Sequence, residues 1–144
     1  MTRDDRAVGQ EREGGFRAGL LEAGIVLPEE LYGLSEFSVE SGYRQAKAIL
    51  EKNSDIDIIS CATDTIAAGA MEALKECKKE RREKVKVTGF GDNQFLKAVS
   101  EGITTVHFYY KTSGIKAAEM LLDIIEEGRQ VPIRMKLGYQ IMEH

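Results

Sequence analysis

Two kinds of segment alternate along this chain, and that alternation most constrains its fold. Segments whose apolar residues repeat with a helical period are separated by short stretches rich in β-branched residues. We expect helices over 12–23, from Ser38 or Ser41 to 50, over 63–77 and 112–128, and strands over 57–62, 85–89 and 103–106. Such alternation is typical of an α/β fold with a mainly parallel sheet.

Weaker signals predict the remaining elements. A strand is expected over 32–37, a short helix over 95–100, and one or two short strands within 131–142. The run 75–84 is dense in both charge signs and is interpreted as a solvated helix end and loop.

Residues at the predicted helix ends fit capping positions. Gly24 and Gly128 stand where a left-handed C-terminal cap belongs. Either residue of two polar pairs could provide an N-cap: Thr63 or Asp64 for the third helix, and Thr112 or Ser113 for the last.

Composition limits the classes of function. The 144 residues, 42% of them hydrophobic, suffice for one domain with one core, and the formal charge of −4 provides no basic face. We therefore expect no nucleic-acid contact by this stretch itself. No apolar run is long enough to span a bilayer, and the first six residues are too charged for a signal peptide.

The cysteines and the start of the chain give two further expectations. Cys61 and Cys77 stand alone, which favours reduced thiols in the cytoplasm over a disulfide or a zinc site. The chain starts with a helical segment and no leading strand, as if the first part of a larger protein were missing.

Polar and aromatic residues gather at the predicted carboxyl ends of the strands, where open α/β sheets bind ligands. An aromatic platform, an arginine fork and several carboxylate or amide groups suit a small polyol or its phosphate. Each residue taken alone also has an ordinary explanation, as a helix cap, a turn residue, part of the core or solvated surface. The prediction of a ligand site therefore depends on all of them lying at one edge of the sheet. The candidate ligand-binding residues are Arg12, Phe37, Thr63, Asp64, Asp92 and Asn93.

Catalysis, metals and cofactors are not predicted. His107 is interpreted as a structural or pairing residue, and Gly89-Phe90-Gly91 lacks the third glycine of a dinucleotide-binding motif. No nucleophile elbow, phosphate-binding loop or metal-spaced His/Cys cluster is found.

Four motifs occur in a characteristic order. They are Arg12-x-x-Gly15-Phe16, then Thr63-Asp64-x-x-Ala67-x-Gly69-Ala70-x-x-Ala73-Leu74, then Val87-x-Gly89-Phe90-x-Asp92, and then Thr104-Thr105-Val106 with Gly114. In this order and spacing the chain resembles the effector-binding core of the lactose-repressor (LacI/GalR) family. The stretch 89–93 together with 104–114 is most similar to the sucrose-operon repressors of Gram-positive bacteria.

The resemblance implies a type I periplasmic-binding-protein-like fold, a three-layer α/β/α lobe. Residues 1–112 would form the C-terminal lobe, 113–130 a crossover helix belonging to an absent N-terminal lobe, and 131–144 returning strands. The DNA-binding headpiece would be absent as well, so operator DNA would be contacted only by a part outside this chain.

Individual positions carry expectations from the same resemblance. Arg12 matches an arginine that reaches the effector, Phe37 an aromatic ring that stacks on it, and Thr63 a polar contact. Asp64 matches an acid that caps the following helix. Gly91 replaces an aspartate that normally accepts sugar hydroxyls, for which Asp92 or Asn93 could substitute. The positions that match dimer-interface residues are Ala68, Met71 and Val99.

The expected function is that of a cytoplasmic, homodimeric, sugar-responsive repressor without enzymatic activity or cofactor. Its effector would be a sugar or sugar phosphate, with sucrose 6-phosphate the first candidate. Two alternatives are a sugar-binding receptor of a transport system and a small magnesium-dependent phosphoryl-transfer domain using Asp64 and Asp92.

Overall fold

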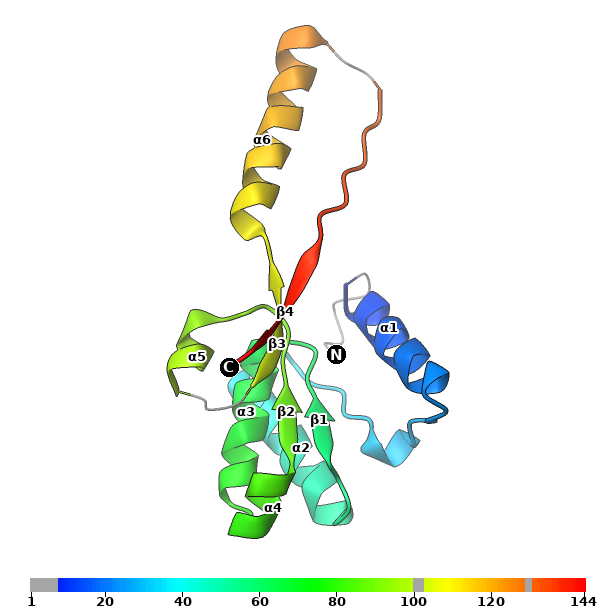
Figure 1. The fold of residues 1–144 in the computed structure, drawn as a ribbon, viewed down its shortest axis with the longest axis vertical. Helices are drawn as coiled ribbons and strands as arrows, with labels where there is room; N and C mark the ends of the chain where they lie inside the picture. Colours follow the sequence, from blue (N-terminus) through cyan, green and yellow to red (C-terminus); the bar gives the residue numbers. More distant parts are fainter. Residues whose placement is uncertain (1–7, 100–102, 129–130) are drawn as a thin grey trace.

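The computed structural model describes residues 8–99, 103–128 and 131–144, and gives no side-chain description of Val99 and Glu127. A four-stranded sheet lies at its centre, with helices around it and one helix extending away (Figure 1). In chain order the elements are α1 Val8–Glu22, the 3-10 turn η1 Glu29–Leu31, α2 Val39–Lys52, β1 Ile58–Ser60, α3 Asp64–Lys75, α4 Lys79–Lys84, β2 Lys86–Thr88, α5 Gln94–Val99, β3 Thr104–Phe108, α6 Tyr110–Glu127 and β4 Tyr139–Glu143.

The sheet has the strand order β1-β2-β3-β4. The first three strands are parallel, and β4 runs antiparallel to β3, pairing Thr104 with Glu143 and Phe108 with Tyr139. The predicted α/β class with a mainly parallel sheet is therefore confirmed. The three predicted central strands all form, with ends one to two residues from those expected, as is usual for strand boundaries.

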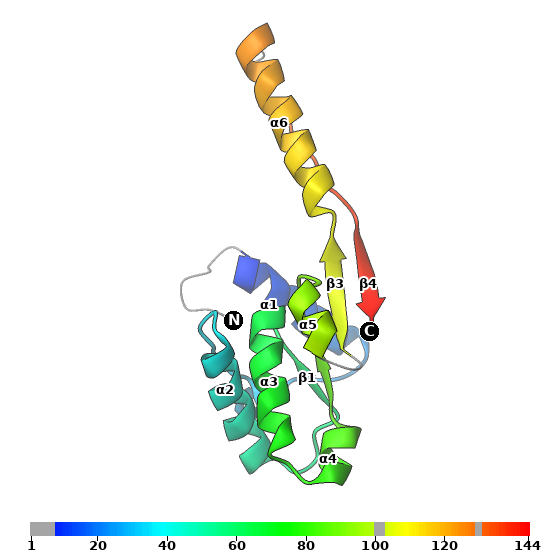
Figure 2. The same cartoon turned by 90° about the vertical axis from the view of Figure 1, so that its left-hand side faces the viewer.

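One helical layer covers the sheet. Helices α2 and α3 pack together on one face of the strands (Figure 2). The apolar stripes predicted for both helices supply much of the core, which consists of Ala46, Leu50, Ile56, Cys61, Ile66, Ala67, Ala70, Ala73, Leu74, Val85, Val87, Leu96 and Ile103. Of the three layers expected, the described residues supply the sheet and this helical layer, while α1 lies beyond the β1 edge (Figure 1).

The two packed helices cross at a pair of glycines. A Cβ added at Gly69 would collide with the Val39 carbonyl oxygen and would lie 2.5 Å from the Tyr43 nitrogen. A Cβ at Gly42 would collide with the Ile66 carbonyl oxygen. Backbone thus packs directly on backbone here, and only glycine permits that approach.

Helix α1 ends as predicted. Gly24 has a φ of +75°, its N–H donates to the Leu21 carbonyl, and the Ile25 N–H donates to the Leu20 carbonyl. This pair of bonds is a Schellman C-cap. The apolar side chains of α1 remain open to solvent in part, with Phe16 42% and Leu21 67% exposed.

The predicted strand over 32–37 is wrong. The chain forms η1 and then irregular structure up to α2, because β1 is the sheet edge and no strand described here lies beside 32–37 to pair with it. The segment is held by side chains instead. The Ser35 hydroxyl donates to Ser41 Oγ, which also accepts the Glu36 N–H, and Ser38 is the actual N-cap of α2.

Two other boundaries also differ from expectation. Helix α6 begins at Tyr110, two and three residues before the predicted caps Thr112 and Ser113, and its N-cap Tyr109 makes no side-chain capping bond. Within the run 75–84, the residues of α4 form a short helix instead of a loop. The Gly128 cap, with a φ of +63°, is confirmed.

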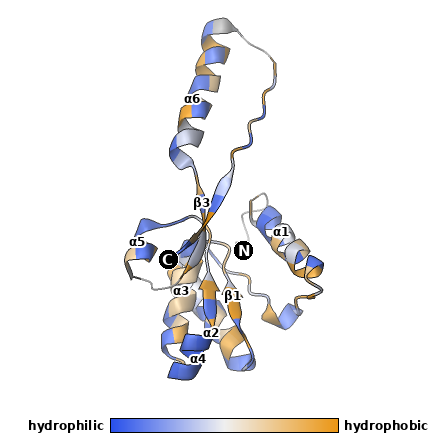
Figure 3. Ribbon diagram, viewed as in Figure 1, coloured by the Kyte–Doolittle hydropathy of each residue, from blue (hydrophilic) through white to orange (hydrophobic). Residues whose placement is uncertain are grey.

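Helix α6 and the return segment 131–138 form an arm that extends from the lobe (Figures 1 and 2). Within the predicted 131–142 tail, β4 is the regular element. Hydrophobic residues are interspersed along the arm without a covering layer (Figure 3). Those exposed by half or more include Leu121, Leu122, Ile124, Ile125 and Val131.

Among the residues described, no helix has the length and apolar character required to cross a membrane.

Candidate functional site

The Asp64 carboxylate joins the carboxyl ends of β1 and β2 to the neighbouring strand β3. Asp64 follows β1 and is only 4% exposed. Its Oδ1 accepts a hydrogen bond from the Thr105 hydroxyl on β3 at 2.6 Å, and its Oδ2 accepts the Asn93 N–H after β2 at 2.6 Å. A buried carboxylate satisfied in this way fixes the positions of the loops that surround it.

The residues next to Asp64 complete this arrangement. The Thr63 side chain accepts the Ile66 N–H and is therefore the N-cap of α3, so the expectation that Asp64 caps the helix is wrong. Asp64 is instead the first helical residue, and its carboxylate turns toward β2 and β3. A Cβ at Gly89 would overlap Asp64 Oδ1, which explains the glycine at the end of β2.

Asp92 lies at the centre of a second polar cluster. Its side chain is 6% exposed and contacts Lys97 Nζ at 2.7 Å, His107 Nδ1 at 2.6 Å and His144 Nε2 at 3.2 Å. Burial would raise the pKa of this carboxyl, but hydrogen bonds from Lys97, His144 and His107 outweigh it and hold the pKa below 3.8. His107 is thus a pairing residue, as predicted.

The backbone at Asp92 has a left-handed conformation. Its φ is +56°, a value that is uncommon outside glycine but that aspartate and asparagine adopt more readily than other residues. Its N–H also lies 3.2 Å from Thr105 Oγ1, so Thr105 links the Asp64 and Asp92 clusters. The turn at Asp92 is therefore held by its backbone contact to Thr105 and by the ion pairs of its side chain.

Asn93 is exposed and caps a helix. Its Oδ1 accepts the Phe95 N–H at 2.9 Å, which makes it the N-cap of α5. Its own N–H is the donor to Asp64. Both interactions are structural, and the side-chain amide group remains at the surface.

Arg12 on α1 reaches the same edge of the sheet. Its Nη1 donates to the Ala62 carbonyl at 2.8 Å, directly before the Thr63 cap. Its guanidinium lies over the Phe90 ring, with 4.2 Å from Cζ to the ring centroid. This is the contact that joins α1 to the ends of β1 and β2.

Phe90 is the first of three aromatic rings in contact, none of which was predicted from the sequence as a ligand-binding residue. Phe90 and Phe108 lie 5.0 Å apart between centroids, and Phe108 and Tyr110 lie 5.8 Å apart in an edge-on arrangement. The Tyr110 hydroxyl donates to the Gly91 carbonyl at 3.3 Å. The available signal was the position of Phe108 at the end of β3 and of Phe90 two residues after the end of β2.

The structure thus unites most, but not all, of the predicted ligand-binding set. Arg12, Thr63, Asp64, Asp92 and Asn93 share the carboxyl edge of the sheet. Phe37 is 63% exposed, and within the described residues no hydrogen bond, ion pair or ring contact links it to them.

The structure says less about the three residues expected at a dimer interface. Ala68 and Met71 lie on α3, partly buried against the core. Val99 ends α5, and its side chain lies outside the described residues.

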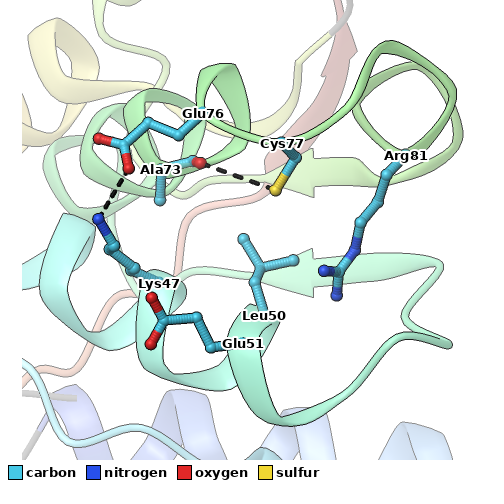
Figure 4. A pocket seen from close by; sticks show the side chains of 7 residues that line it. All are labelled: Lys47, Leu50, Glu51, Ala73, Glu76, Cys77 and Arg81. Atoms are coloured by element: carbon cyan, nitrogen blue, oxygen red, sulfur yellow. Dashed lines mark hydrogen bonds and ion pairs between the residues drawn. The ribbon is translucent and has the colours of Figure 1, made fainter.

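A shallow hollow occurs at the opposite end of the lobe. It lies between α2, α3 and α4 and is lined by Lys47, Leu50, Glu51, Ala73, Glu76, Cys77 and Arg81 (Figure 4). Its volume of about 140 Å³ is small beside the roughly 300–1,000 Å³ of typical ligand sites. The strand-end edge is therefore the better candidate.

The thiols and the acidic groups give no sign of a metal centre. Cys61 and Cys77 are both free, and burial raises the pKa of the Cys61 thiol to about 12. Among the described residues, no group of three or more histidine, cysteine or acidic side chains is placed to hold a metal ion.

An open, mainly parallel sheet whose strand ends carry a cation, aromatic rings and polar groups defines a small-molecule-binding α/β lobe. Residues 1–143 match the model of the periplasmic binding protein-like domain, and the chain belongs to that family.

Its relatives are transcriptional regulators of the LacI family, a family without enzymatic activity. The HTH-type transcriptional regulator CelR of Thermobifida fusca is 28% identical over 138 residues, 96% of this chain and 41% of that protein. The HTH-type transcriptional repressor PurR of Erwinia tasmaniensis is 34% identical over 126 residues, 88% of this chain and 37% of that protein.

A solved structure supports the same assignment. The complex of transcriptional regulator CelR with cellobiose superposes with a TM-score of 0.80 at 27% identity, covering 92% of this chain and 40% of that one. The chain thus spans about two fifths of the length of these relatives.

Proposed function

We propose that this chain is part of the effector-binding core of a sugar-responsive bacterial repressor. The observation that carries the proposal is Arg12, stacked on Phe90 and bonded to Ala62 at the carboxyl ends of the parallel strands. A planar guanidinium on an aromatic ring suits a ligand with hydroxyls and an anionic group. The relative CelR has been solved with a disaccharide.

The proposal includes a division of the chain between two lobes. Residues 1–112 form one lobe, 113–130 belong to a helix of a second lobe, and 131–144 return to the first. The apolar arm that leaves the lobe at β3 and re-enters at β4 supports this division. Operator DNA is contacted by a headpiece outside this chain, and dimers form through Ala68, Met71 and Val99 in the cytoplasm.

Effector binding between the two lobes shifts their closure, because a ligand stabilises the arrangement to which it binds better. The headpiece geometry that fits the operator is then less populated, and the DNA is released. The first candidate effector is sucrose 6-phosphate.

A sugar-binding receptor of a transport system is the second candidate. It is favoured by the family description, periplasmic binding protein-like. Binding of the full-length protein to its own promoter DNA, released by the effector, separates the two functions. A receptor would bind sugar and would not shift the DNA in an electrophoretic assay.

A magnesium-dependent phosphoryl-transfer domain has little support from the geometry. Asp64 is saturated by Thr105 and Asn93, and Asp92 by Lys97 and two histidines. Both carboxylates are thus engaged by donors of the protein, whereas that chemistry needs carboxylates that ligate a cation.

Isothermal titration calorimetry on the full-length protein tests the proposed function. We expect saturable heat with sucrose 6-phosphate, and weaker binding of sucrose. Binding of a different sugar or sugar phosphate would support the proposed function but would show that sucrose 6-phosphate is not the effector. No heat with any sugar or sugar phosphate would refute it.

A further inference from the structure

Helix α4 and the residues that flank it concentrate positive charge on an acidic chain. Residues 75–86 contain seven lysines and arginines and three glutamates, a net charge of +4, whereas the whole chain carries −4. The helix lies at the end of the lobe opposite the arm (Figure 1). One end of the lobe therefore has a positive potential, which attracts an anionic partner.

Several of these cations have no partner within the protein. Neighbouring carboxylates neutralise Lys75, Lys79 and Lys84. By contrast, Lys78, Arg82 and Lys86 are exposed, and among the described residues none of the three has an ion pair or a hydrogen bond. Lys78 and Arg82 are about one turn of α4 apart, so they lie on the same side of it. Their charges are available to a bound partner.

The shallow hollow between α2, α3 and α4 provides an apolar recess beside this helix. Leu50, Ala73 and Cys77 contribute apolar surface, and Lys47 and Arg81 lie on opposite sides of it (Figure 4). Its volume of about 140 Å³ is close to the roughly 150 Å³ of a protein cavity that binds benzene. The hollow therefore has room for one leucine-sized side chain.

Arg81 connects the hollow to the basic helix. Its Nη2 donates to the Asn53 carbonyl, which fixes the guanidinium in place. Its Nε is buried and, among the described residues, has no hydrogen-bond partner. A buried donor without an acceptor costs free energy. An acceptor on a segment bound in the hollow would remove that cost.

Acidic side chains at the same end distinguish between two classes of anionic partner. Glu51 and Glu76 line the hollow, and Glu80 and Glu83 lie on α4 among the cations. A nucleic acid presents a continuous line of phosphates, which these carboxylates would repel. A peptide can instead place its own carboxylates on the cations and an apolar side chain in the hollow. The surface therefore fits an acidic peptide better than a nucleic acid.

We propose that α4 and the adjoining hollow form a docking surface for an acidic segment of a partner protein. One leucine-sized side chain of that segment fills the hollow, and an oxygen of the segment accepts a hydrogen bond from Arg81. Its carboxylates pair with Lys78 and Arg82. The surface lies away from the carboxyl ends of the strands, so a docked partner leaves the candidate ligand site open.

Fluorescence anisotropy of this chain with labelled probes tests the surface. The probes are a peptide of aspartates and glutamates around one central leucine, the same peptide with a central alanine, and a DNA duplex. We expect saturable binding of the leucine peptide that weakens as salt is added. The alanine peptide should bind about fivefold or more weakly, because it buries less apolar surface. The duplex should show no saturable binding.

Substitutions then test the residues. Lys78→Glu with Arg82→Glu should weaken binding of the leucine peptide about tenfold or more, because like charges then meet across the contact. Lys111→Glu with Lys116→Glu is the matched control, because it changes the net charge equally on α6, at the other end of the molecule (Figure 1). Cys77→Leu fills the hollow and should remove the advantage of the leucine peptide over the alanine peptide.

Several results would overturn the docking surface. They are no binding of the leucine peptide, equal affinity for the two peptides, and equal weakening by the two pairs of charge reversals. Preferential binding of the duplex would assign the surface to a nucleic acid instead. Loss of self-association in Lys78→Glu with Arg82→Glu would assign it to a second copy of this chain. If Cys77→Leu fails to fold, as judged by circular dichroism, the two peptides still measure the contribution of the hollow in the wild-type chain. None of these results bears on effector binding.

Discussion

At the scale of single residues, two buried carboxylates organise the strand ends in different ways. Asp64 accepts neutral donors, a hydroxyl and a backbone N–H, whereas Asp92 is surrounded by basic side chains. Asp64 therefore acts as a geometric link between loops. Asp92 instead forms ion pairs with these side chains, and the strength of the ion pairs depends on pH.

Replacing Asp64 tests the first role. Asp64→Ala removes two hydrogen bonds and leaves the buried Thr105 hydroxyl without its acceptor. We expect a loss of about 2–4 kcal/mol in the free energy of unfolding, measured by urea denaturation. Asp57→Ala, at a side chain 74% exposed, is the control and should change it little. A loss no larger than that of the control would contradict the role.

Acid titration tests Asp92. Because its folded-state pKa lies below 3.8, the charged form contributes stability above that pH. This contribution is lost as the pH falls through the lower folded-state pKa. Asp92→Asn should lower the urea midpoint at pH 7 and flatten its decline below about pH 4. Asp55→Asn, 93% exposed, should leave the decline unchanged, and a wild-type profile in Asp92→Asn would exclude the role.

These residues could be placed from the sequence, but their contacts within the protein could not. The sequence pattern placed Asp64, Asp92 and Asn93 at one edge because parallel strands bring their carboxyl ends together. It could not show that Thr105 and His107, distant in the chain, would occupy the carboxylates. Nor did it single out Phe90 and Phe108, since rings near a strand end are more often core.

At the scale of elements, the α2–α3 pair is the best-packed part of the lobe. Its helices were predictable because their stripes of Ala, Ile and Leu recur with the helical period. The strand expected over 32–37 was wrong because strand formation depends on a neighbour that local patterning does not reveal.

The crossing of these helices gives a sharp test. Gly69→Ala forces a methyl group into the Val39 backbone, so the helices must separate. We expect about 1–3 kcal/mol of destabilisation, typical of overpacking. Gly19→Ala in α1, with open space around the added Cβ, should instead raise the thermal midpoint slightly. Equal effects of the two substitutions would contradict the close crossing.

At the scale of the whole molecule, the arm is the least covered part. Its apolar side chains, such as Leu121 and Ile125, are more than half exposed although α6 is regular from Tyr110 to Glu127. A surface of this kind is normally buried against another body. Under the proposed domain organisation, a second lobe would be that body.

Self-association of the 144-residue chain tests the exposed arm. Without a covering lobe, we expect dimers or larger species that dissociate on dilution, seen by light scattering after size-exclusion chromatography. Leu122→Lys with Ile125→Lys should shift the chain toward monomer. A Val131→Thr variant, a milder change on the same arm, serves for comparison. A strictly monomeric wild-type chain at high concentration would contradict this expectation.

The paired strands β3 and β4 have a mechanical consequence. The arm is joined to the lobe by two antiparallel connections held in register by five residue pairs. Two hydrogen-bonded strands, and not a single chain, therefore carry any movement of the arm into the lobe. A displacement of the arm would move both strands, and with them His107 on β3 and His144 directly after β4, which both contact Asp92.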